Sequence, residues 1–319
     1  MSSLATEPAA PPASVSSPPR PRRRRRLPTV PWLLLSASIL ILGVLTGYPV
    51  VRMLVMSFQE YERAQVMGMP AEWVGFDNYT AILTDSAFWA VLGRSILFML
   101  VAVVLTMVLG TLIALLMMRL GKGLRLLVSV GLLLAWSMPP LSSTTIWGWI
   151  FDTQYGLVNN LLTRFTGERW FGHSWLLDPL GFFTILTFII VWGAIPFVAF
   201  TMYAGLSQIP GEVLEAAQLD GAGAFARFRL VMLPYVRTIV TVLVVLSMIW
   251  DLKVFPQVYA LQDIGGDRQK TNTIGVYIYQ MGMGQGHFGT ASAIAFVFVA
   301  IMLLLSIYYV RRTMKEEEL

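Results

Sequence analysis

The residues best suited to bind a polar ligand lie in one apolar stretch near residue 250. Asp251 and Lys253 are charged, and charged residues in an apolar span are costly and usually face the interior of a helix bundle. Because they are two positions apart, they do not face each other on a regular helix, so each needs another partner or a local unwinding. The same stretch contains aromatic and amide side chains, namely Trp250, Phe255, Gln257 and Tyr259. Such a set could bind a sugar, although helix packing and structural ion pairs would explain the same residues.

The sequence contains no recognisable catalytic or metal-binding set. The number of cysteines is 0, which removes thiolate ligands and cysteine nucleophiles. Neither G-x-x-x-x-G-K-[S/T] nor H-E-x-x-H occurs. His173 and His287 are the only histidines, and both fall in predicted external loops, where we expect them to be solvated. We therefore predict a chain that is not an enzyme and binds no metal or cofactor of its own.

The elements that position these residues are predicted to lie in lipid. Of 319 residues, 56% are hydrophobic and 13% are charged, whereas about 25% of a soluble domain is charged. Several apolar segments approach the ~20 residues that cross a hydrocarbon core of ~30 Å. They are roughly Pro31–Pro49, Val91–Met118, Leu126–Trp147, Leu180–Tyr203, Thr238–Phe255 and Phe288–Val310. Because they are continuously apolar rather than alternating, we predict an all-α polytopic membrane protein with six transmembrane helices.

The distribution of Lys and Arg predicts the orientation of the chain. With six spans, fifteen of the 23 basic residues lie on the side of the termini, helped by an arginine cluster within residues 20–26. This bias predicts that both termini are cytoplasmic. Residues 1–28 are too rich in Pro, Ala, Ser and Arg to bury a core, so we predict a disordered tail before one membrane domain over residues 29–319. The apolar run after Pro31 is long, which favours a retained helix over a cleaved signal peptide.

The fourth loop, Leu206–Tyr235, is on the predicted cytoplasmic side and is too long for a plain connector. Pro210 suits the first turn of a helix, a Glu- and Ala-rich stretch follows, and Gly221 favours a turn. A second short helix would place Phe225 and Phe228 on one face. A helix resting on the membrane surface is the alternative. The first piece lacks a bulky apolar stripe, however, so insertion into a protein cleft fits it better.

This loop closely resembles the "EAA" loop of binding-protein-dependent ABC importer permeases. The residues that match the family pattern are Glu215, Ala216, Ala217, Asp220, Gly221, Ala222, Leu233 and Pro234, with Val231 where Ile is usual. In that family the loop forms a coupling helix that docks into a groove of a cytoplasmic ATPase. The resemblance implies a coupling role for Glu215, Ala216, Ala217, Asp220, Gly221 and Phe225, with Glu215 and Gly221 the foremost candidates.

Other segments extend the resemblance over most of residues 30–310. They are Phe76-Asp77-Asn78-Tyr79, the stretch from Trp147 through Tyr155 to Asn159, and Trp192 with Pro196 and Phe197. Together they resemble the carbohydrate-uptake branch and its maltose-F-like subunit. The resemblance implies a second permease, two ATPase chains that bind ATP and Mg, an extracytoplasmic solute-binding protein, and a di- or oligosaccharide substrate. The chain departs from the family at Pro256, where Asp is common, so a ligand role for that Asp cannot be transferred.

Prolines indicate where the solute would bind. Pro196 lacks an N–H, which would free the carbonyl of Trp192, and Pro256 would do the same for Leu252 if the helix continues that far. Interrupted helices near the membrane midplane often form transport sites. We therefore predict substrate contacts from Trp192, Phe197, Trp250, Asp251, Lys253, Phe255, Gln257 and Tyr259. The alternatives are an importer of glycerol phosphate or an oligopeptide, a secondary transporter, and a membrane enzyme. The aromatic external loops suit either an interfacial belt or a docking surface for the solute-binding protein.

Overall fold

The computed structural model describes residues 29–317, so the predicted disordered tail, residues 1–28, lies outside the described residues. The chain forms two compact units, Met1–Val51 and Arg52–Leu319. In the first unit, α1 (Thr29–Leu42) continues through a π-helical turn, η1 (Gly43–Gly47), into the start of α2 (Tyr48–Ser57). The segment Ser38–Ser57 is apolar enough to span a membrane.

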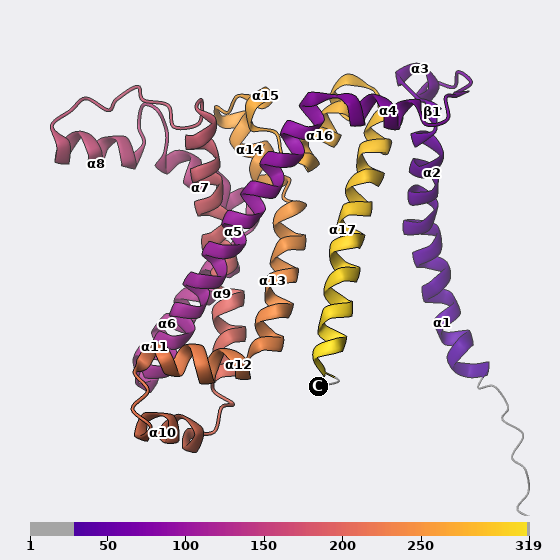
Figure 1. Cartoon of the computed structure of the whole chain (residues 1–319). Coiled ribbons are helices and arrows are strands. Elements are labelled where there is room, and N and C mark those ends of the chain that lie inside the picture. The colour runs from indigo at the N-terminus through magenta and orange to yellow at the C-terminus, as the bar shows by residue number, and fades with distance from the viewer. Residues whose placement is uncertain (1–28, 318–319) are drawn as a thin grey trace, which may run out of the picture. The chain divides into compact units, whose positions relative to one another are not determined.

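The second unit is almost entirely helical (Figure 1). Its long helices are α5 (Ser86–Arg119), α6 (Lys122–Trp136), α7 (Pro140–Ile150), α9 (Pro179–Leu206), α13 (Arg237–Leu252) and α17 (Phe288–Glu317). Near one end of these helices lie α10 (Gly211–Leu219), α11 (Ala224–Arg227), η2 (Phe228–Met232) and α12 (Leu233–Tyr235). Near the other end lie α3 (Arg63–Val66), α4 (Asp77–Thr84), α8 (Leu157–Thr166), α14 (Pro256–Ile264), α15 (Arg268–Thr271), α16 (Ile274–Tyr279) and η3 (Gln280–Gln285). A two-stranded antiparallel ribbon of β1 (Gln59–Glu60) and β2 (Glu72–Trp73) pairs Gln59 with Trp73.

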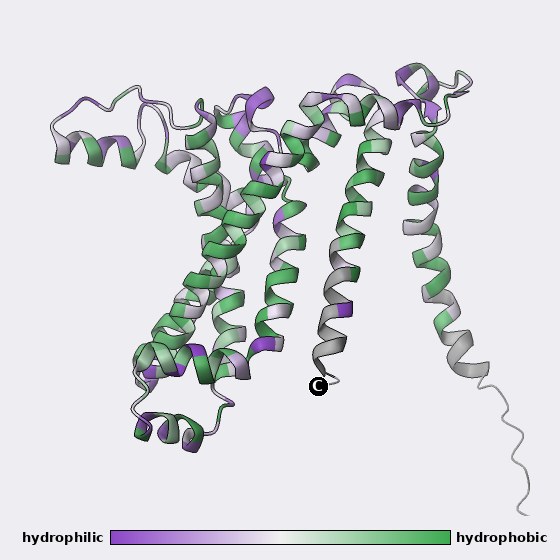
Figure 2. Ribbon diagram, viewed as in Figure 1, coloured by the Kyte–Doolittle hydropathy of each residue, from purple (hydrophilic) through white to green (hydrophobic). Residues whose placement is uncertain are grey.

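The predicted apolar segments correspond to helices of three kinds. Within the described residues, three helices are long and apolar enough to cross a membrane by themselves, namely Ser38–Ser57, α5 and α9. Two further spans are possible if each of two bent helix pairs crosses as one, and Phe288–Leu304 of α17 is a shorter apolar helix. Figure 2 shows apolar residues along most of these helices. The helical membrane fold is as predicted, and the count of six spans stays a prediction.

The third predicted span is wrong as a continuous helix. The chain bends by 98° between α6 and α7. Pro139 and Pro140 explain the bend, since proline supplies no N–H to the preceding turn and Pro140 is suited to open a new helix. The fifth predicted span, Thr238–Phe255, begins as predicted, since α13 starts at Arg237, but it ends earlier. A bend of 79° at Val236 separates α12 from α13, and α13 ends at Leu252 rather than Phe255.

The core of the second unit is the contact between α5 and α9. Gly110 of α5 permits it, because a Cβ atom at that position would lie 2.6 Å from Cγ1 of Val198. Val198 and Met202 of α9 are fully buried against Ala114 of α5. Elsewhere on its surface α5 exposes large apolar side chains such as Leu97 and Val104, as expected of a surface that meets lipid.

Candidate functional site

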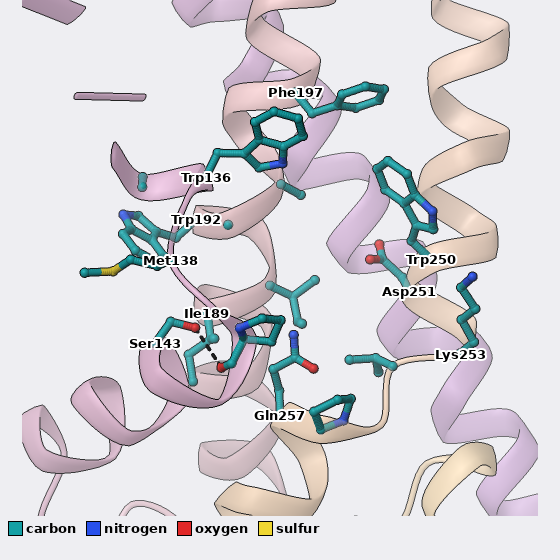
Figure 3. A pocket seen from close by; sticks show the side chains of 17 residues that line it. Trp136, Met138, Ser143, Ile189, Trp192, Phe197, Trp250, Asp251, Lys253 and Gln257 are labelled. Carbon is teal, nitrogen blue, oxygen red and sulfur yellow. Dashed lines mark hydrogen bonds between the residues drawn. The ribbon is translucent and has the colours of Figure 1, made fainter. Parts of the chain in front are cut away.

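A cavity of about 440 Å³ lies between two helix breaks and a continuous helix that contains a proline (Figure 3). Its walls come from the α6–α7 bend, the middle of α9, and the junction between α13 and α14. The lining side chains include Trp136, Met138, Ser143, Ile189, Trp192, Phe197, Trp250, Asp251, Lys253 and Gln257. A cavity of this size falls in the range of ~300–1,000 Å³ typical of small-molecule sites.

Prolines lie in or beside each wall of the cavity. Pro196 lies inside α9 and leaves the carbonyl of Trp192 without its usual i+4 donor. Pro256 does not interrupt a helix, so the condition under which it would free the carbonyl of Leu252 is not met. The helix has already ended at Leu252, and Pro256 instead opens α14 after a short irregular segment. Irregular backbone at membrane depth needs protein or water beside it, which the cavity provides.

Two polar groups of the cavity lack partners among the described residues. The side chain of Asp251 is buried, with 6% of its surface exposed, and no hydrogen bond or ion pair joins it to any described residue. The amide oxygen of Gln257 is likewise buried without a hydrogen-bond partner among the described residues. Lys253 is exposed and not paired with Asp251, because the chain leaves the helix between them. Buried polar groups usually have partners, so these two are available to a ligand.

Aromatic rings surround these polar groups. Trp136 stacks on Phe197, with ring centroids 6.4 Å apart, and Phe197 contacts Trp250 at 5.1 Å. Trp192 packs edge-on against Trp147 at 5.9 Å. In Figure 3, Trp136 and Trp192 approach the cavity from one side and Trp250 with Asp251 from the other. The arrangement offers flat apolar faces beside a hydrogen-bond acceptor.

The structure places six of the eight predicted substrate residues on this cavity, namely Trp192, Phe197, Trp250, Asp251, Lys253 and Gln257. The other two, Phe255 and Tyr259, do not line it. They stack on each other at 5.6 Å and both contact Tyr279 of α16. The unwinding at residues 253–255 changes the direction of the side chains that follow, which separates this aromatic cluster from the cavity.

Sequence reasoning missed the residues that α6 and α7 contribute. Trp136 and Met138 precede the bend, and Ser143 follows it, with its hydroxyl donating to the carbonyl of Pro140. The adjacent pair Pro139-Pro140 inside an apolar run was the available signal, because two consecutive prolines interrupt a helix more strongly than one.

The fourth loop folds as a helix, a turn and a second helical segment, as predicted. Pro210 precedes α10 as its cap residue rather than occupying the first turn. Gly221 has a φ of +82°, and it ends α10 with the N–H groups of Gly221 and Ala222 bonded to the carbonyls of Gln218 and Ala217. This is a Schellman ending, which favours glycine at the left-handed position.

The surface of the fourth loop is open to a partner. Glu215, Ala216, Asp220 and Gly221 are exposed, Ala217 is half-buried, and the side chain of Phe225 is 75% exposed. Phe225 and Phe228 do not share one buried face, since Phe228 lines a small cavity beneath α10 while Phe225 points away from it. Arg227 donates a hydrogen bond to Gln218 at 2.9 Å and so joins the two helical segments.

The lobe formed by residues 151–178 is organised around Asn159. This side chain is fully buried and donates to the carbonyls of Asp152, Thr153 and His173, while its oxygen accepts from Trp175 Nε1 at 2.6 Å. Asp152 Oδ1 accepts from the backbone N–H groups of Tyr155 and Gln154, and these hydrogen bonds lower the pKa of Asp152. His173 is exposed, as predicted for a histidine outside the spans.

Asn78 is a second structural asparagine. It donates to the carbonyls of Ser57 and Gln59 and accepts from the hydroxyl of Thr290. It thus holds the ribbon against the start of α17. The other histidine, His287, is exposed and pairs with Glu62, Nδ1 to Oε1, at 2.8 Å.

Interrupted helices around a cavity with aromatic walls and unpartnered polar groups are typical of membrane transport proteins. The family described as binding-protein-dependent transport system inner membrane component matches residues 106–312. The chain belongs to this family, whose members are permease subunits of ABC importers and leave ATP hydrolysis to separate chains.

Individual relatives agree with this assignment. The diacetylchitobiose uptake system permease protein DasB of Streptomyces coelicolor is 42% identical over 288 residues, which cover 90% of this chain and 88% of that protein. The trehalose/maltose transport system permease protein MalF of Thermococcus litoralis is 31% identical over 65% of this chain and 68% of its own length. A solved bacterial ABC transporter involved in the import of the acidic polysaccharide alginate has a chain with the same fold, with a TM-score of 0.77 at 19% identity. That match covers 90% of this chain and 96% of the other.

Proposed function

We propose that this permease subunit passes a neutral di- or oligosaccharide through the cavity between α6, α9 and α13 by alternating access. The observation that supports this most is the pairing of aromatic faces with unpartnered polar groups in one cavity. Trp136, Trp192 and Trp250 offer apolar faces to sugar rings, whose C–H groups need such surfaces. Asp251 accepts hydrogen bonds from sugar hydroxyls, and Gln257 offers its amide.

The names of the relatives support a carbohydrate substrate. They include uptake systems for diacetylchitobiose, trehalose/maltose and sulfoquinovosyl glycerol. Diacetylchitobiose, trehalose and maltose are uncharged sugars, and the aromatic faces of the cavity suit their rings. Glycerol phosphate has no such ring, so the cavity favours a neutral sugar over it.

The fourth loop is the proposed docking site for the ATPase. Glu215, Ala216, Ala217, Asp220 and Gly221 form or end the coupling helix, and Phe225 adds an exposed apolar side chain beside it. An apolar side chain with this exposure is typical of a surface that a protein partner covers. The partner ATPase chains bind ATP and Mg, and this chain binds no cofactor.

The proposal also includes the orientation of the chain in the membrane and the limits of its domain. The fourth loop faces the cytoplasm of a bacterial cell, both termini lie on that side of the plasma membrane, and residues 29–319 form one permease domain. A second permease subunit completes the path as a heterodimer, and an extracytoplasmic solute-binding protein delivers the sugar. The basic residues in and directly after the fourth loop, such as Arg227, Arg229 and Arg237, support this orientation.

The proposal is tested by purifying the tagged chain with its partners and reconstituting the complex in liposomes. We expect an ATPase and a second permease to co-purify. We also expect ATP-dependent uptake of one sugar from a panel of N,N′-diacetylchitobiose, trehalose, maltose and glycerol 3-phosphate. Uptake of glycerol 3-phosphate alone would contradict the neutral-sugar proposal. Uptake of a sugar without ATP would contradict the importer mechanism.

A further inference from the structure

We propose that a groove on the α5–α9 surface binds one phospholipid, with the lipid phosphate on Arg94 and an acyl chain along α5. The groove has a volume of about 450 Å³ and is lined mainly by Arg94, Leu97, Val101, Leu105, Leu180 and Phe183. It is separate from the sugar cavity, since the two share no lining residue.

Arg94 has donor capacity that the protein leaves unused. Within the described part of the chain its guanidinium makes one hydrogen bond, from Nη2 to the carbonyl of Gln269 at a long 3.4 Å. No described carboxylate lies within ion-pair distance, and Nε is buried without an acceptor among the described residues. The N–H donors on Nη1 and Nη2 form a fork that matches a phosphate, so a phosphodiester would accept the hydrogen bonds that the protein leaves unmade.

The position of Arg94 along α5 matches the depth of a lipid phosphate. No charged residue lies between Arg94 and Arg119. The two arginines are 25 positions apart, a rise of ~38 Å along the helix, close to the ~40–45 Å thickness of a bilayer with its headgroups. Arg94, near the start of α5, therefore lies at one edge of the membrane. The start of α5 is the end opposite the fourth loop (Figure 1).

The rest of the groove matches an acyl chain in length and polarity. From Arg94 to Leu105 the helix rises ~16 Å, about half the ~30 Å thickness of the hydrocarbon core and thus the depth of one leaflet. Leu97, Val101 and Leu105 follow one another at i, i+4 and i+8 and form the floor, with Leu97 64% exposed. Leu180 and Phe183 of α9 form the wall. The hydroxyl of Thr184 already donates a hydrogen bond to the carbonyl of Leu180, so it needs no hydrogen-bond partner from the lipid.

The proposal is tested on the assembled, delipidated transporter by native mass spectrometry. The probes are dioleoylphosphatidylglycerol and dioleoylglycerol, which share acyl chains and differ in the phosphate headgroup. We expect saturable binding of the phospholipid, about tenfold weaker after Arg94→Gln, as for the loss of one charged hydrogen-bonding contact. Val101→Trp fills the groove and should reduce binding with Arg94 intact, whereas Val104→Trp, exposed on α5 outside the groove, should not. Equal binding of both probes, or equal binding by all variants, would overturn the proposal.

A photo-crosslinking amino acid in place of Leu97 distinguishes lipid from protein as the occupant. We expect the crosslinked adduct in native membranes to be a phospholipid, identified by its mass. A crosslink to the second permease subunit would show that protein covers the groove and would refute lipid binding there. This outcome is independent of the sugar proposal, because transport of a sugar can be measured whichever occupant is found.

Discussion

Replacing Asn159 with Ala should loosen the lobe of residues 151–178 without unfolding the rest of the protein. The change removes an amide that donates to three carbonyls and accepts from the indole N–H of Trp175. A net hydrogen bond contributes ~0.5–1.5 kcal/mol, and a buried group left unpaired costs ~1–3 kcal/mol. The amide has two N–H donors, shared among the three carbonyls, and one acceptor oxygen. Their loss therefore amounts to about 3 kcal/mol of local stability.

Hydrogen exchange of the purified transporter measures this effect directly. A loss of about 3 kcal/mol raises the population of the open lobe, and hence the exchange rate of its protected amides, by roughly 100-fold. Asn160→Ala is the matched control, because Asn160 is half-buried and makes no side-chain hydrogen bond within the described part of the chain. An unchanged exchange rate in Asn159→Ala would contradict the role of Asn159 in holding the lobe together. So would an increase spread evenly over α5 and α9, which would indicate global destabilisation.

Three further predictions follow from the glycines and from Asp152. Gly110→Ala should lower the unfolding temperature in detergent, because overpacking against the fully buried Val198 costs ~1–3 kcal/mol. The control is Gly93→Ala on the same helix, whose new methyl group meets open space and should leave the unfolding temperature unchanged. Gly221→Ala should weaken the coupling of ATP hydrolysis to uptake, since an alanine in the left-handed backbone conformation costs ~1–2 kcal/mol. Gly223→Ala should be tolerated, because the φ of Gly223 is −64°. Equal effects of the two substitutions would contradict the coupling assignment. Hydrogen bonds lower the pKa of Asp152, so its ionised form stabilises the lobe above the unfolded pKa of ~3.9, and this stabilisation is lost as pH falls through the folded pKa. The difference in exchange protection between wild type and Asp152→Asn should therefore vanish in acid. A difference that stays constant with pH would argue against this role of Asp152.

The apolar segments and the fourth loop were predictable because their signals are local. Continuous apolar runs define α5 and α9, and the Glu- and Ala-rich stretch before Gly221 defines α10 and its turn. The left-handed φ of Gly221 follows from the Schellman ending, which short-range backbone bonds create. Such features depend on residues a few positions apart, which a sequence displays directly.

The cavity was only partly predictable, because its walls depend on where helices stop. Phe255 and Tyr259 were expected beside Asp251 on the assumption that the helix continued. The chain unwinds at residues 253–255 and the rings turn toward Tyr279 instead. Trp136 was not expected, because the bend at Pro139-Pro140 was read as part of a continuous span.

The two asparagines of the family motifs show a different limit. Asn78 and Asn159 were identified from the family motifs, but they donate to backbone carbonyls up to 21 residues away and accept from the side chains of Thr290 and Trp175. No spacing rule in the sequence relates an amide to carbonyls in an irregular loop. Their role in holding the loops in place is therefore a result of the tertiary structure.

The proposed role of the cavity in sugar transport is tested by measuring sugar uptake by the reconstituted transporter carrying Trp250→Ala, with Trp149→Ala as the control. Trp250 lines the cavity and contacts Phe197 at 5.1 Å, whereas Trp149 is 74% exposed outside it. Loss of an aromatic contact of ~1.4 kcal/mol predicts about tenfold slower uptake at low sugar concentration. ATP hydrolysis stimulated by the binding protein should remain, and Trp149→Ala should transport normally. Normal uptake by Trp250→Ala, or an equal loss in both variants, would contradict the claim that the sugar passes through this cavity.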